Sequence, residues 1–521
     1  MTPQLRKVFP PVALLAIAIT LNNCAMTRPA HRGKIQEDFL EELQGPANGK
    51  GVIETVWLQI NDVYEMLPME GGTAGGLARV ARLEQKLIAE NPNTRMIIAG
   101  DFFSPSALGA AEVDGRKLNG RQMVDTLAAA GLDIAVFGNH EFDIPEEDFR
   151  LRLEESKNRF SWIGGNVLDA KTGKPFSGTS PHPVIEFADQ EGDRVRIGIL
   201  ALTIDSSQKP YVKYLEPLPF AKKAIQELKK QKADIILAIT HQSIEEDRQL
   251  VESFPEIDLL MGGHEHVAMR VPVKNSKTEK ETLITKADAN AKTAWIHALR
   301  WDTEKKSLSL ASTLQEIGDR SPEDARITEL AQQWVNRAYD GYRAKGFEPA
   351  ARVTDLKKPL DGREEVIRKQ STSLSEVLLD ALMRQAPHAD IALFNSGLIR
   401  VDDIIQPGPI TEYDILRIAP FPDDVMTAQI TGADLIRIRE YNDKARGDGM
   451  YLQIRSKVPL SELLSERTYT VVLNTYLVGR LRGGLAFSSD GKTPPKEDPL
   501  RNAKKGMEFR KAIIESLRKR S

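Results

Sequence analysis

The sequence has little cysteine, since Cys24 is the single thiol among 521 residues. One thiol excludes disulfide frameworks, cysteine-rich zinc sites and CxxC redox chemistry. Charge of one sign is not in excess either, because 71 lysines and arginines against 74 aspartates and glutamates leave a net charge of -3. That balance argues against a partner bound by phosphate neutralisation, so no nucleic acid is expected. Histidine is also scarce, at eight residues, which makes any clustering of histidines informative.

The N-terminal apolar run, residues 12–21, is too short to span a bilayer as a permanent helix. Following two basic residues, it is typical of a secretory signal peptide. The stretch Leu21-Asn22-Asn23-Cys24 resembles a bacterial lipobox, in which the cysteine becomes the lipidated first residue. An ordinary secretory signal with an incidental cysteine is the alternative. We expect residues 1–24 to be a lipoprotein signal peptide, residues 25–50 to be a polar tether, and Cys24 to attach an exported protein to a membrane of the cell envelope.

The length of the chain predicts more than one domain, because 521 residues exceed an ordinary single core. From residue 52 onward, short apolar runs alternate with stretches of helical periodicity, which is typical of α/β or layered αββα domains. We expect a first α/β domain over residues 51–315, a linker helix within 316–350, a second α/β domain over 351–495 and a basic helix within 496–521. In the first domain the predicted strands are 52–60, 96–99, 134–137, 162–164, 195–202, 235–239 and 259–261, and the predicted helices are 76–90, 120–130, 146–156, 220–231 and 244–254.

Five of these strands end alike, with metal-ligand residue types directly after the apolar run. In chain order they lead to Asp62, Asp101, Asn139-His140, His241 and His264-Glu265-His266. Because functional crevices of open α/β sheets lie beyond the carboxyl ends of the strands, we expect these residues on one rim. Glycines before several of them would allow sharp exits and let a substrate approach the backbone. A lone aspartate or histidine there is usually a helix cap, but this set holds four of the eight histidines and suits Mn, Fe, Zn or Co.

The motifs Gly100-Asp101, Gly138-Asn139-His140-Glu141 and Gly263-His264-Glu265-His266 resemble the signature of the binuclear metallophosphoesterases. More narrowly, residues 75–79, 99–106 and 138–143 resemble the 5′-nucleotidase family. In the second half, residues 359–363, 395–400, 420–422 and 431–432 resemble that family's C-terminal domain. The resemblance implies a four-layer αββα metallophosphoesterase domain, a helical linker and a C-terminal α/β domain that binds substrate.

The resemblance also implies roles for the residues of the rim. Asp101 would bridge two divalent ions, with Asp62 and His266 completing one site and Asn139, His241 and His264 the other. His140, paired with Asp143, would stabilise the charge that develops on the transferred phosphoryl group. For Asp143, a helix N-cap is an equally weighted alternative. Glu141 and Glu265 would support the ligands or face solvent.

In the second domain the resemblance implies a nucleotide site. Phe421 and Tyr476 would stack on the two faces of a base, while Arg368, Asn395 and Arg400 would make polar contacts. Such stacking tolerates any base, so it does not name the nucleotide.

Three departures from the family distinguish this chain. The family's Glu-x-x-x-Gly-Asn stretch near the start of the second domain reads here as Ser371-Thr372-Ser373-Leu374-Ser375-Glu376. Tyr64 stands where the family has a histidine ligand, and a neutral phenol, with a pKa of about 10, is a poor ligand. We therefore expect the metal site at Asp62 to be weaker or differently populated, with Tyr64 an uncertain ligand. Residues 483–487 lack the aspartate that would contact the ribose.

The predicted function is that of an exported phosphomonoesterase that uses two divalent ions and acts on nucleotides. One alternative is a hydrolase of another ester, such as a 2′,3′-cyclic nucleotide, a sugar phosphate or a sulfur ester. The other is a lipoprotein that binds such a ligand but has impaired turnover. The sequence does not indicate an oligomeric state.

Overall fold

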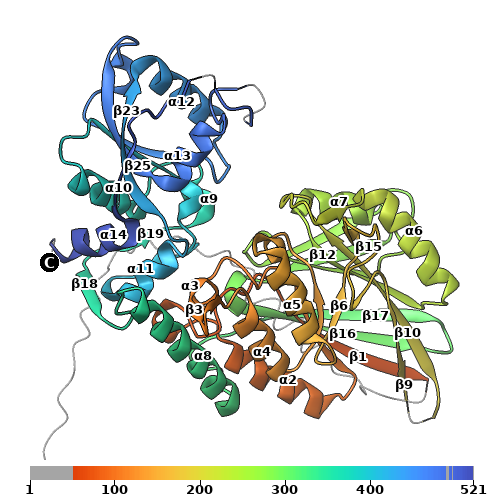
Figure 1. The fold of residues 1–521 in the computed structure, drawn as a ribbon. Coiled ribbons are helices and arrows are strands. Elements are labelled where there is room, and N and C mark those ends of the chain that lie inside the picture. Colours follow the sequence, from red (N-terminus) through yellow and green to blue (C-terminus); the bar gives the residue numbers. More distant parts are fainter. Residues whose placement is uncertain (1–50, 190, 489–491, 496, 520–521) are drawn as a thin grey trace, which may run out of the picture.

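The computed structural model describes residues 51–189, 191–488, 492–495 and 497–519, and it contains two α/β domains connected by one long helix (Figure 1). The predicted signal peptide, the tether and Cys24 lie outside the described residues. Among the residues that are described, none of the helices combines the length and apolar character that crossing a membrane requires.

The first domain begins with a seven-stranded sheet in the order β17-β16-β1-β2-β5-β6-β8. Neighbours from β1 to β8 are parallel, whereas β16 and β17 return antiparallel along the edge. The bounds are β1 (Val52–Ile60), β2 (Thr94–Ala99), β5 (Leu132–Val136), β6 (Ser161–Ile163), β8 (Thr179–Ser180), β16 (Thr293–Asp302) and β17 (Ser307–Glu316). On its outer side lie α2 (Leu77–Glu90), α4 (Arg121–Ala129) and α5 (Glu146–Ser156).

A second, six-stranded sheet has the order β14-β15-β13-β12-β10-β9, with β10, β12, β13 and β15 parallel. Its strands are β9 (Val184–Ala188), β10 (Arg194–Thr203), β12 (Ile235–His241), β13 (Leu259–Gly262), β14 (Met269–Lys274) and β15 (Glu281–Lys286). Its helices are α6 (Pro217–Lys230) and α7 (Ile244–Ser253). Shorter elements of this domain are η1 (Glu70–Gly72), α3 (Ala107–Ala110), β3 (Glu112–Val113), β4 (Arg116–Lys117), η2 (His140–Asp143), β7 (Val167–Asp169), β11 (Val212–Tyr214) and η3 (Ala289–Ala291).

Alternation of side chains along the strands creates the four layers. In β1, Trp57 points into an apolar cluster shared with Ile199 and Ile239 of the second sheet. The neighbouring Leu58 points the other way, into the cluster under the outer helices. Strands have a side-chain period of two, so both faces of a buried strand must be apolar. A third cluster, containing Leu200 and Leu228, lies between the second sheet and α6. The αββα prediction is therefore confirmed.

The linker helix α8 (Ala325–Ala344) packs on the first domain. Asp324 caps its first turn by accepting hydrogen bonds from the backbone N–H groups of Arg326 and Ile327. Near its end, the hydroxyl of Tyr342 donates to the carbonyl of Ala107 at 2.6 Å. The apolar cluster on the first sheet continues through α8 into the second domain, where it includes Ile415. The two domains thus share one continuous core at this helix.

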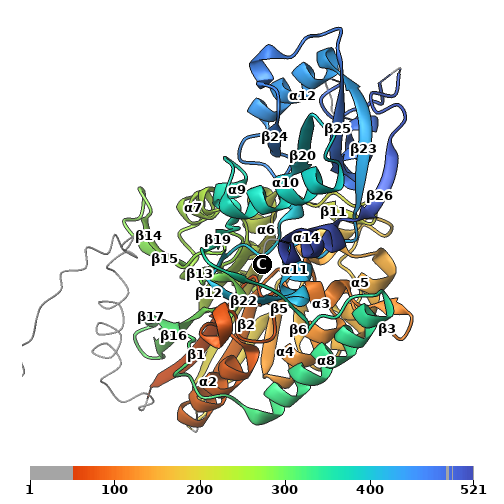
Figure 2. The same cartoon turned by 90° about the vertical axis from the view of Figure 1, so that its left-hand side faces the viewer.

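The second domain is built on a five-stranded sheet in the order β24-β20-β25-β23-β26. Figure 2 shows α10 and α14 side by side next to it, with apolar faces in one cluster. The predicted basic C-terminal helix is therefore half buried. The strands are β20 (Ile391–Asn395), β23 (Asp424–Thr431), β24 (Leu452–Ser456), β25 (Thr468–Asn474) and β26 (Lys504–Glu508). The helices are α10 (Ser373–Gln385), α11 (Glu412–Ile418), α12 (Gly432–Lys444), α13 (Thr475–Arg482) and α14 (Phe509–Arg518). Short elements are β18 (Arg352–Leu356), β19 (Leu360–Asp361), α9 (Glu364–Ile367), η4 (Ser396–Leu398), β21 (Ile404–Ile405), β22 (Gly408–Thr411) and η5 (Leu460–Glu462).

Gly341 in α8 provides a test of how this helix docks. Glycine inside a helix is usually less stable than alanine by about 0.5–1 kcal/mol. A Cβ at Gly341, however, would lie 2.1 Å from the carbonyl oxygen of Glu112 in β3. We expect Gly341→Ala to lower the free energy of unfolding by roughly 1–3 kcal/mol, as overpacking does elsewhere. A fall in the thermal unfolding midpoint would report it.

Gly479 in α13 is the matched control, because a Cβ there has no neighbour within 4 Å. Gly479→Ala should raise the unfolding midpoint. Equal stabilisation by both substitutions would contradict the packing of α8 against β3.

Candidate metal centre

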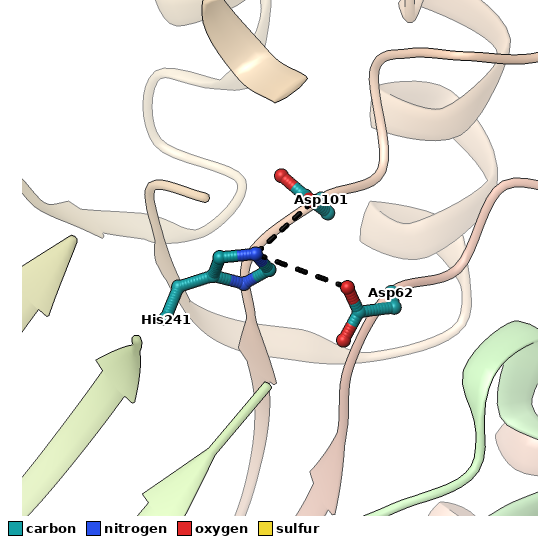
Figure 3. A group of neighbouring side chains, drawn as sticks. All are labelled: Asp62, Asp101 and His241. Carbon is teal, nitrogen blue, oxygen red and sulfur yellow. Dashed lines mark ion pairs between the residues drawn. The ribbon is translucent and has the colours of Figure 1, made fainter. Parts of the chain in front are cut away.

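The carboxyl ends of three parallel strands meet where the two sheets of the first domain come together. Asp62 follows β1, Asp101 follows β2, and His241 ends β12 (Figure 3). The Nε2 atom of His241 lies 3.0 Å from Oδ2 of Asp101 and 3.9 Å from Oδ1 of Asp62. All three side chains are fully buried. The residues at these strand ends therefore meet as expected, with Asp62 and Asp101 from the first sheet and His241 from the second.

Burial of these acids requires positive charge nearby. Burial alone would raise the pKa of Asp62, but the charges of His241 and His266 hold it below its ordinary value. For His241 burial acts in the opposite direction, and the charges of Asp101 and Asp62 nevertheless raise its pKa to about 9. The site therefore attracts cations.

The hydrogen bonds leave lone pairs free for a metal ion. Nδ1 of His241 lies 2.8 Å from the carbonyl oxygen of Ala99, so this nitrogen carries the proton and donates. Nε2 then faces the two carboxylates. With a pKa of about 9, the ring carries a second proton on Nε2, directed at Asp101, and loss of that proton would leave a lone pair aimed at the rim. Among the described residues, the buried Oδ1 of Asn139 has no hydrogen-bond partner. An orphaned acceptor of this kind beside two carboxylates fits a divalent ion with mixed nitrogen and oxygen ligands.

The remaining predicted ligands reach the same rim. The backbone N–H of His140 donates to Oδ1 of Asp101 at 2.7 Å, which places Asn139 beside that carboxylate. His264 lies edge-on to His241, with ring centres 5.3 Å apart, and its backbone N–H donates to Asp62. Burial and the charge of His241 lower the pKa of His264 to about 3, so its ring is neutral, as ligation requires.

Four of the six predicted ligands have left-handed backbone. The φ angles are 52° at Asp62, 57° at Asp101, 87° at His264 and 60° at His266. Such conformations cost of the order of 1–3 kcal/mol each and concentrate at functional sites. The sequence offers no signal for them, because none of the four is glycine.

The glycines before the ligands leave room for the ligand loops themselves. A Cβ at Gly138 would lie 2.1 Å from Oδ1 of Asp101, and one at Gly263 would lie 2.3 Å from the carbonyl oxygen of Ala99. The space on the Cβ side of these glycines is taken by the neighbouring strand ends, so packing within the rim alone already requires glycine. The expectation that they let a substrate approach the backbone stays a prediction.

Glu141 is fully buried and holds the Asp101 loop in place. Its carboxylate accepts hydrogen bonds from the backbone N–H groups of Asp101, Phe102, Phe103 and Gly138, at 2.6–3.2 Å. Burial and the charge of Asp101 raise its pKa to about 7. Glu141 therefore supports the ligand loop and does not face solvent.

Glu265 also has a supporting role, because its carboxylate accepts hydrogen bonds from the backbone N–H of Ile244 and from the ammonium group of Lys286.

Two amide residues near Asp62 in the chain, Gln59 and Asn61, also support the rim, and they were not identified from the sequence. The amide of Gln59 donates to the carbonyls of Gly262 and Thr285, and the amide of Asn61 donates to Asp62 and to the carbonyl of Ala287. Both amides therefore link the first sheet to the second below the rim. Their position at the end of β1 and directly after it is the signal that could have identified them, since buried amides need partners.

His140 and Asp143 form a pair in η2 at the edge of the rim. Nδ1 of His140 lies 2.6 Å from Oδ2 of Asp143. Ser207 donates to the other oxygen of Asp143 at 3.2 Å, and Lys209 lies 3.4 Å from it. The alternative role of Asp143 as a helix cap is not observed, because Pro145 occupies the N-cap of α5.

Tyr64 points into the rim. Its hydroxyl lies 3.1 Å from Nε2 of His266, 3.3 Å from Oδ2 of Asp101 and 3.4 Å from Oδ1 of Asp62. Burial and the charges of Asp101 and Asp62 raise the pKa of Tyr64 well above its ordinary value. The phenol is therefore a protonated donor that shares the space between these three groups.

An open cavity beside the rim lies between the domains. From the first domain it is lined by Tyr64, Glu65, Met69, Pro105, Ser106, Ala107, His140, His266, Ala289 and Asn290; from the second it is lined by Glu364, Arg400, Val401, Asp402, Arg417 and Pro420. Arg400 is thus brought next to His140. Among the described residues, Nε of Arg400 is buried without a hydrogen-bond partner, while its guanidinium lies 5.7 Å from the ring centre of Phe421.

The other predicted substrate residues surround a shared network. Phe421 and Tyr476 are exposed, at 41% and 50%. Asp423 links them, because it accepts from the backbone N–H of Tyr476 and from the amide of Asn474. That amide also lies 3.4 Å from Oδ1 of Asn395. Arg368 makes none of these three hydrogen bonds and is in an ion pair with Glu364 at 2.6 Å.

Comparison with protein families places these features in a known group. Residues 57–268 match the calcineurin-like phosphoesterase family, and residues 350–458 match the 5′-nucleotidase C-terminal domain. The chain belongs to the 5′-nucleotidase family of metallophosphoesterases. The predicted family and the metal-dependent phosphoesterase class are confirmed, while the predicted domain limits stay predictions.

Curated relatives match most of the chain. A 5′-nucleotidase of Vibrio vulnificus is 26% identical over 420 residues, covering 70% of this chain and 71% of its own. Protein UshA of Escherichia coli is 23% identical over 415 residues, with the same coverage.

Solved structures share the fold at low identity. A 5′-nucleotidase precursor from Thermus thermophilus has a TM-score of 0.72 at 21% identity and covers 90% of this chain and 96% of its own. The sulfate thiohydrolase SoxB, also from Thermus thermophilus, has a TM-score of 0.64 at 14% identity and covers 91% and 95%. The fold therefore occurs in enzymes named for different esters.

The contacts of Tyr64 predict how metal binding should change on substitution. Tyr64→His replaces the phenol with an imidazole where the sequence resemblance implies a histidine ligand, so we expect a higher metal-to-protein ratio than in the wild type. Elemental analysis after dialysis against Mn²⁺ would measure it. Tyr64→Phe, which removes the hydroxyl without adding a ligand, is the control and should not raise the ratio. A ratio unaffected by Tyr64→His would show that Tyr64 does not limit the site.

Proposed function

We propose that this protein is a phosphomonoesterase that uses two divalent ions and acts on nucleotides. The observation that carries the proposal is the meeting of three groups at one cavity. The cavity is lined by His266, one of the predicted ligands, by His140 of the His140–Asp143 pair and by Arg400 of the second domain, and the other predicted ligands form the rim beside it. Each group is of the type that phosphoryl transfer to water requires.

Asp62, Asp101, Asn139, His241, His264 and His266 would hold the ions. Divalent ions at such a rim supply Lewis acidity, which lowers the pKa of a bound water and neutralises phosphoryl oxygens. Asp101, which contacts His241 and the hydroxyl of Tyr64, would be the ligand shared by the two ions.

His140 would stabilise charge on the phosphoryl group and its leaving oxygen. Burial lowers the pKa of His140, but the charge of Asp101 and the hydrogen bond with Asp143 raise it above its ordinary value. A raised pKa favours the protonated ring, in which Nδ1 binds Asp143 and Nε2 can donate a hydrogen bond. In the overall reaction, water attacks phosphorus, the P–O bond to the alcohol breaks, and the alcohol oxygen takes up a proton.

Arg400 would bind the phosphate from the second domain. A guanidinium with a buried, unpaired N–H facing a cavity is suited to a phosphate oxygen, because its planar fork of donors matches that geometry. Phe421 and Tyr476 would take the base, with Asp423 holding both segments. Asn395, which Asn474 contacts, and Arg368 would contribute polar contacts.

A second candidate is a hydrolase of another ester. It is favoured by residues 483–487, which lack the family's ribose-contacting aspartate, and by the inward position of Tyr64. A panel of nucleotides, 2′,3′-cyclic nucleotides, sugar phosphates and sulfur esters would separate the two. Ligand-dependent thermal stabilisation without product would instead indicate a binding protein.

For the cellular location, we propose export and lipid attachment at Cys24. The N-terminal sequence pattern is the observation that supports this proposal.

His140 and Asp143 give the first test of the mechanism. His140→Ala should lower kcat/KM by about 10²–10⁴-fold, the usual contribution of a positioned proton donor. Because Asp143 raises the pKa of His140 and the protonated ring is the active form, Asp143→Ala should move the alkaline limb of the pH profile to lower pH. Asp205→Ala, an exposed acid on the same loop as Ser207, is the control. An unmoved limb in Asp143→Ala would argue against the pairing.

The aromatic pair gives the test of nucleotide specificity. Stacking on a base contributes about 1–3 kcal/mol per ring, so Phe421→Ala and Tyr476→Ala should each raise KM for a nucleoside monophosphate by roughly 5–150-fold. Ribose 5-phosphate lacks the base, and its kinetics should be unchanged. Leu464→Ala, an exposed apolar residue of the same domain, controls for surface effects. A loss shared by both substrates would contradict base stacking.

A further inference from the structure

The metal rim receives a contact from the second domain. Asp402 follows η4, and its Oδ2 accepts a hydrogen bond from Nδ1 of His266 at 2.5 Å. Its other oxygen, Oδ1, accepts from the backbone N–H of Glu364 at 2.7 Å. The carboxylate is therefore fixed by its own domain while it reaches across the domain boundary to a predicted metal ligand.

The geometry at His266 is that of a supported ligand. With its proton on Nδ1 and bonded to Asp402, the ring presents Nε2 to the rim, 3.3 Å from Oδ1 of Asp62. A carboxylate bonded to the second nitrogen of a metal-binding histidine fixes the tautomer and the ring orientation, and it makes the ligand more basic. Asp402 has a φ of 40°, a strained conformation of the kind that persists where a side chain must be aimed.

We propose that Asp402 is a positioning residue for His266, and that it couples metal affinity to the arrangement of the two domains. The proposal rests on the proposed function in one respect, that His266 binds a metal ion. In the arrangement described here Asp402 supports His266, whereas displacement of the second domain would remove that support. Coupling of binding equilibria is reciprocal, so metal binding must in turn favour the arrangement in which Asp402 reaches His266.

The adjacent Asp403 offers a matched control. It carries the same charge and also reaches the first domain, where it lies 3.2 Å from Nζ of Lys292. Lys292 is also paired with Glu70, at 3.0 Å, and is not a predicted ligand. Removing Asp403 therefore weakens the contact between the domains without touching the rim.

The test is a titration of the metal-free full chain with Mn²⁺. Asp402→Ala should raise the Kd by about 10–100-fold, the usual effect of losing such a carboxylate. Asp403→Ala should stay within about fivefold of the wild type, as expected for an ordinary ion pair. Asp402→Asn keeps the size and one acceptor oxygen, so it should lie between and serves if Asp402→Ala does not fold. Equal weakening by Asp402→Ala and Asp403→Ala, or none by either, would overturn the positioning role.

Small-angle scattering gives the second readout. The radius of gyration of the wild type should change on addition of Mn²⁺, and the change should be smaller in Asp402→Ala at the same metal occupancy. Identical responses would overturn the coupling between metal and domain arrangement. A wild type that binds no Mn²⁺ would instead refute the proposed function, whereas tight binding by both wild type and Asp402→Ala would refute this inference alone.

Discussion

Two carboxylates, those of Asp62 and Asp101, lie fully buried at the place where two sheets meet, and their charge must be balanced from within the protein or by bound cations. The surroundings are arranged to meet that need. His241 approaches from the opposite sheet, Glu141 binds the backbone that carries Asp101, and Asn61 holds Asp62. Burying such a site lowers the stability of the fold unless the charges are paired, because each unpaired charge in a low dielectric costs several kcal/mol. The strained ligand backbones and the crowded glycines follow from bringing so many donors to one point.

The segment after β1 serves both domains. Asp62 and Tyr64 face the rim, while the next residue, Glu65, lies 3.4 Å from Arg417 and 3.4 Å from the hydroxyl of Tyr413, both on α11. Together with the contact from Asp402 to His266, this makes the metal rim and the domain interface parts of one structure. The substrate cavity has walls from both domains for the same reason.

The fold and the six predicted ligands were accessible from sequence because both depend on local order along the chain. Apolar runs define the strands, and parallel strands put their carboxyl ends on one edge, so a polar residue after each run is already placed. Other features depend on contacts between distant segments. Asp402 lies 136 residues from His266 and in another domain. Glu141 acts through four backbone amides that no pattern predicts, and Pro145 at the N-cap of α5 decides between the two readings of Asp143 only once the turn is seen. The inward direction of Tyr64 likewise depends on neighbours and not on its residue type.

The helix α8 restricts how the second domain can move. The helix is bound to the first domain up to Tyr342, and the segment from Glu348 onward is bound to the second, through Glu348 to Glu412 and Ala351 to the backbone of the same glutamate. Only residues 343–347 remain between these anchors, and the ring of Phe347 packs against Tyr342 on one side and Arg510 on the other. A connection this short would act as a pivot. Any displacement of the second domain that kept this connection would be a rotation about the end of α8, and a ligand held near Arg400 would then travel along an arc centred there.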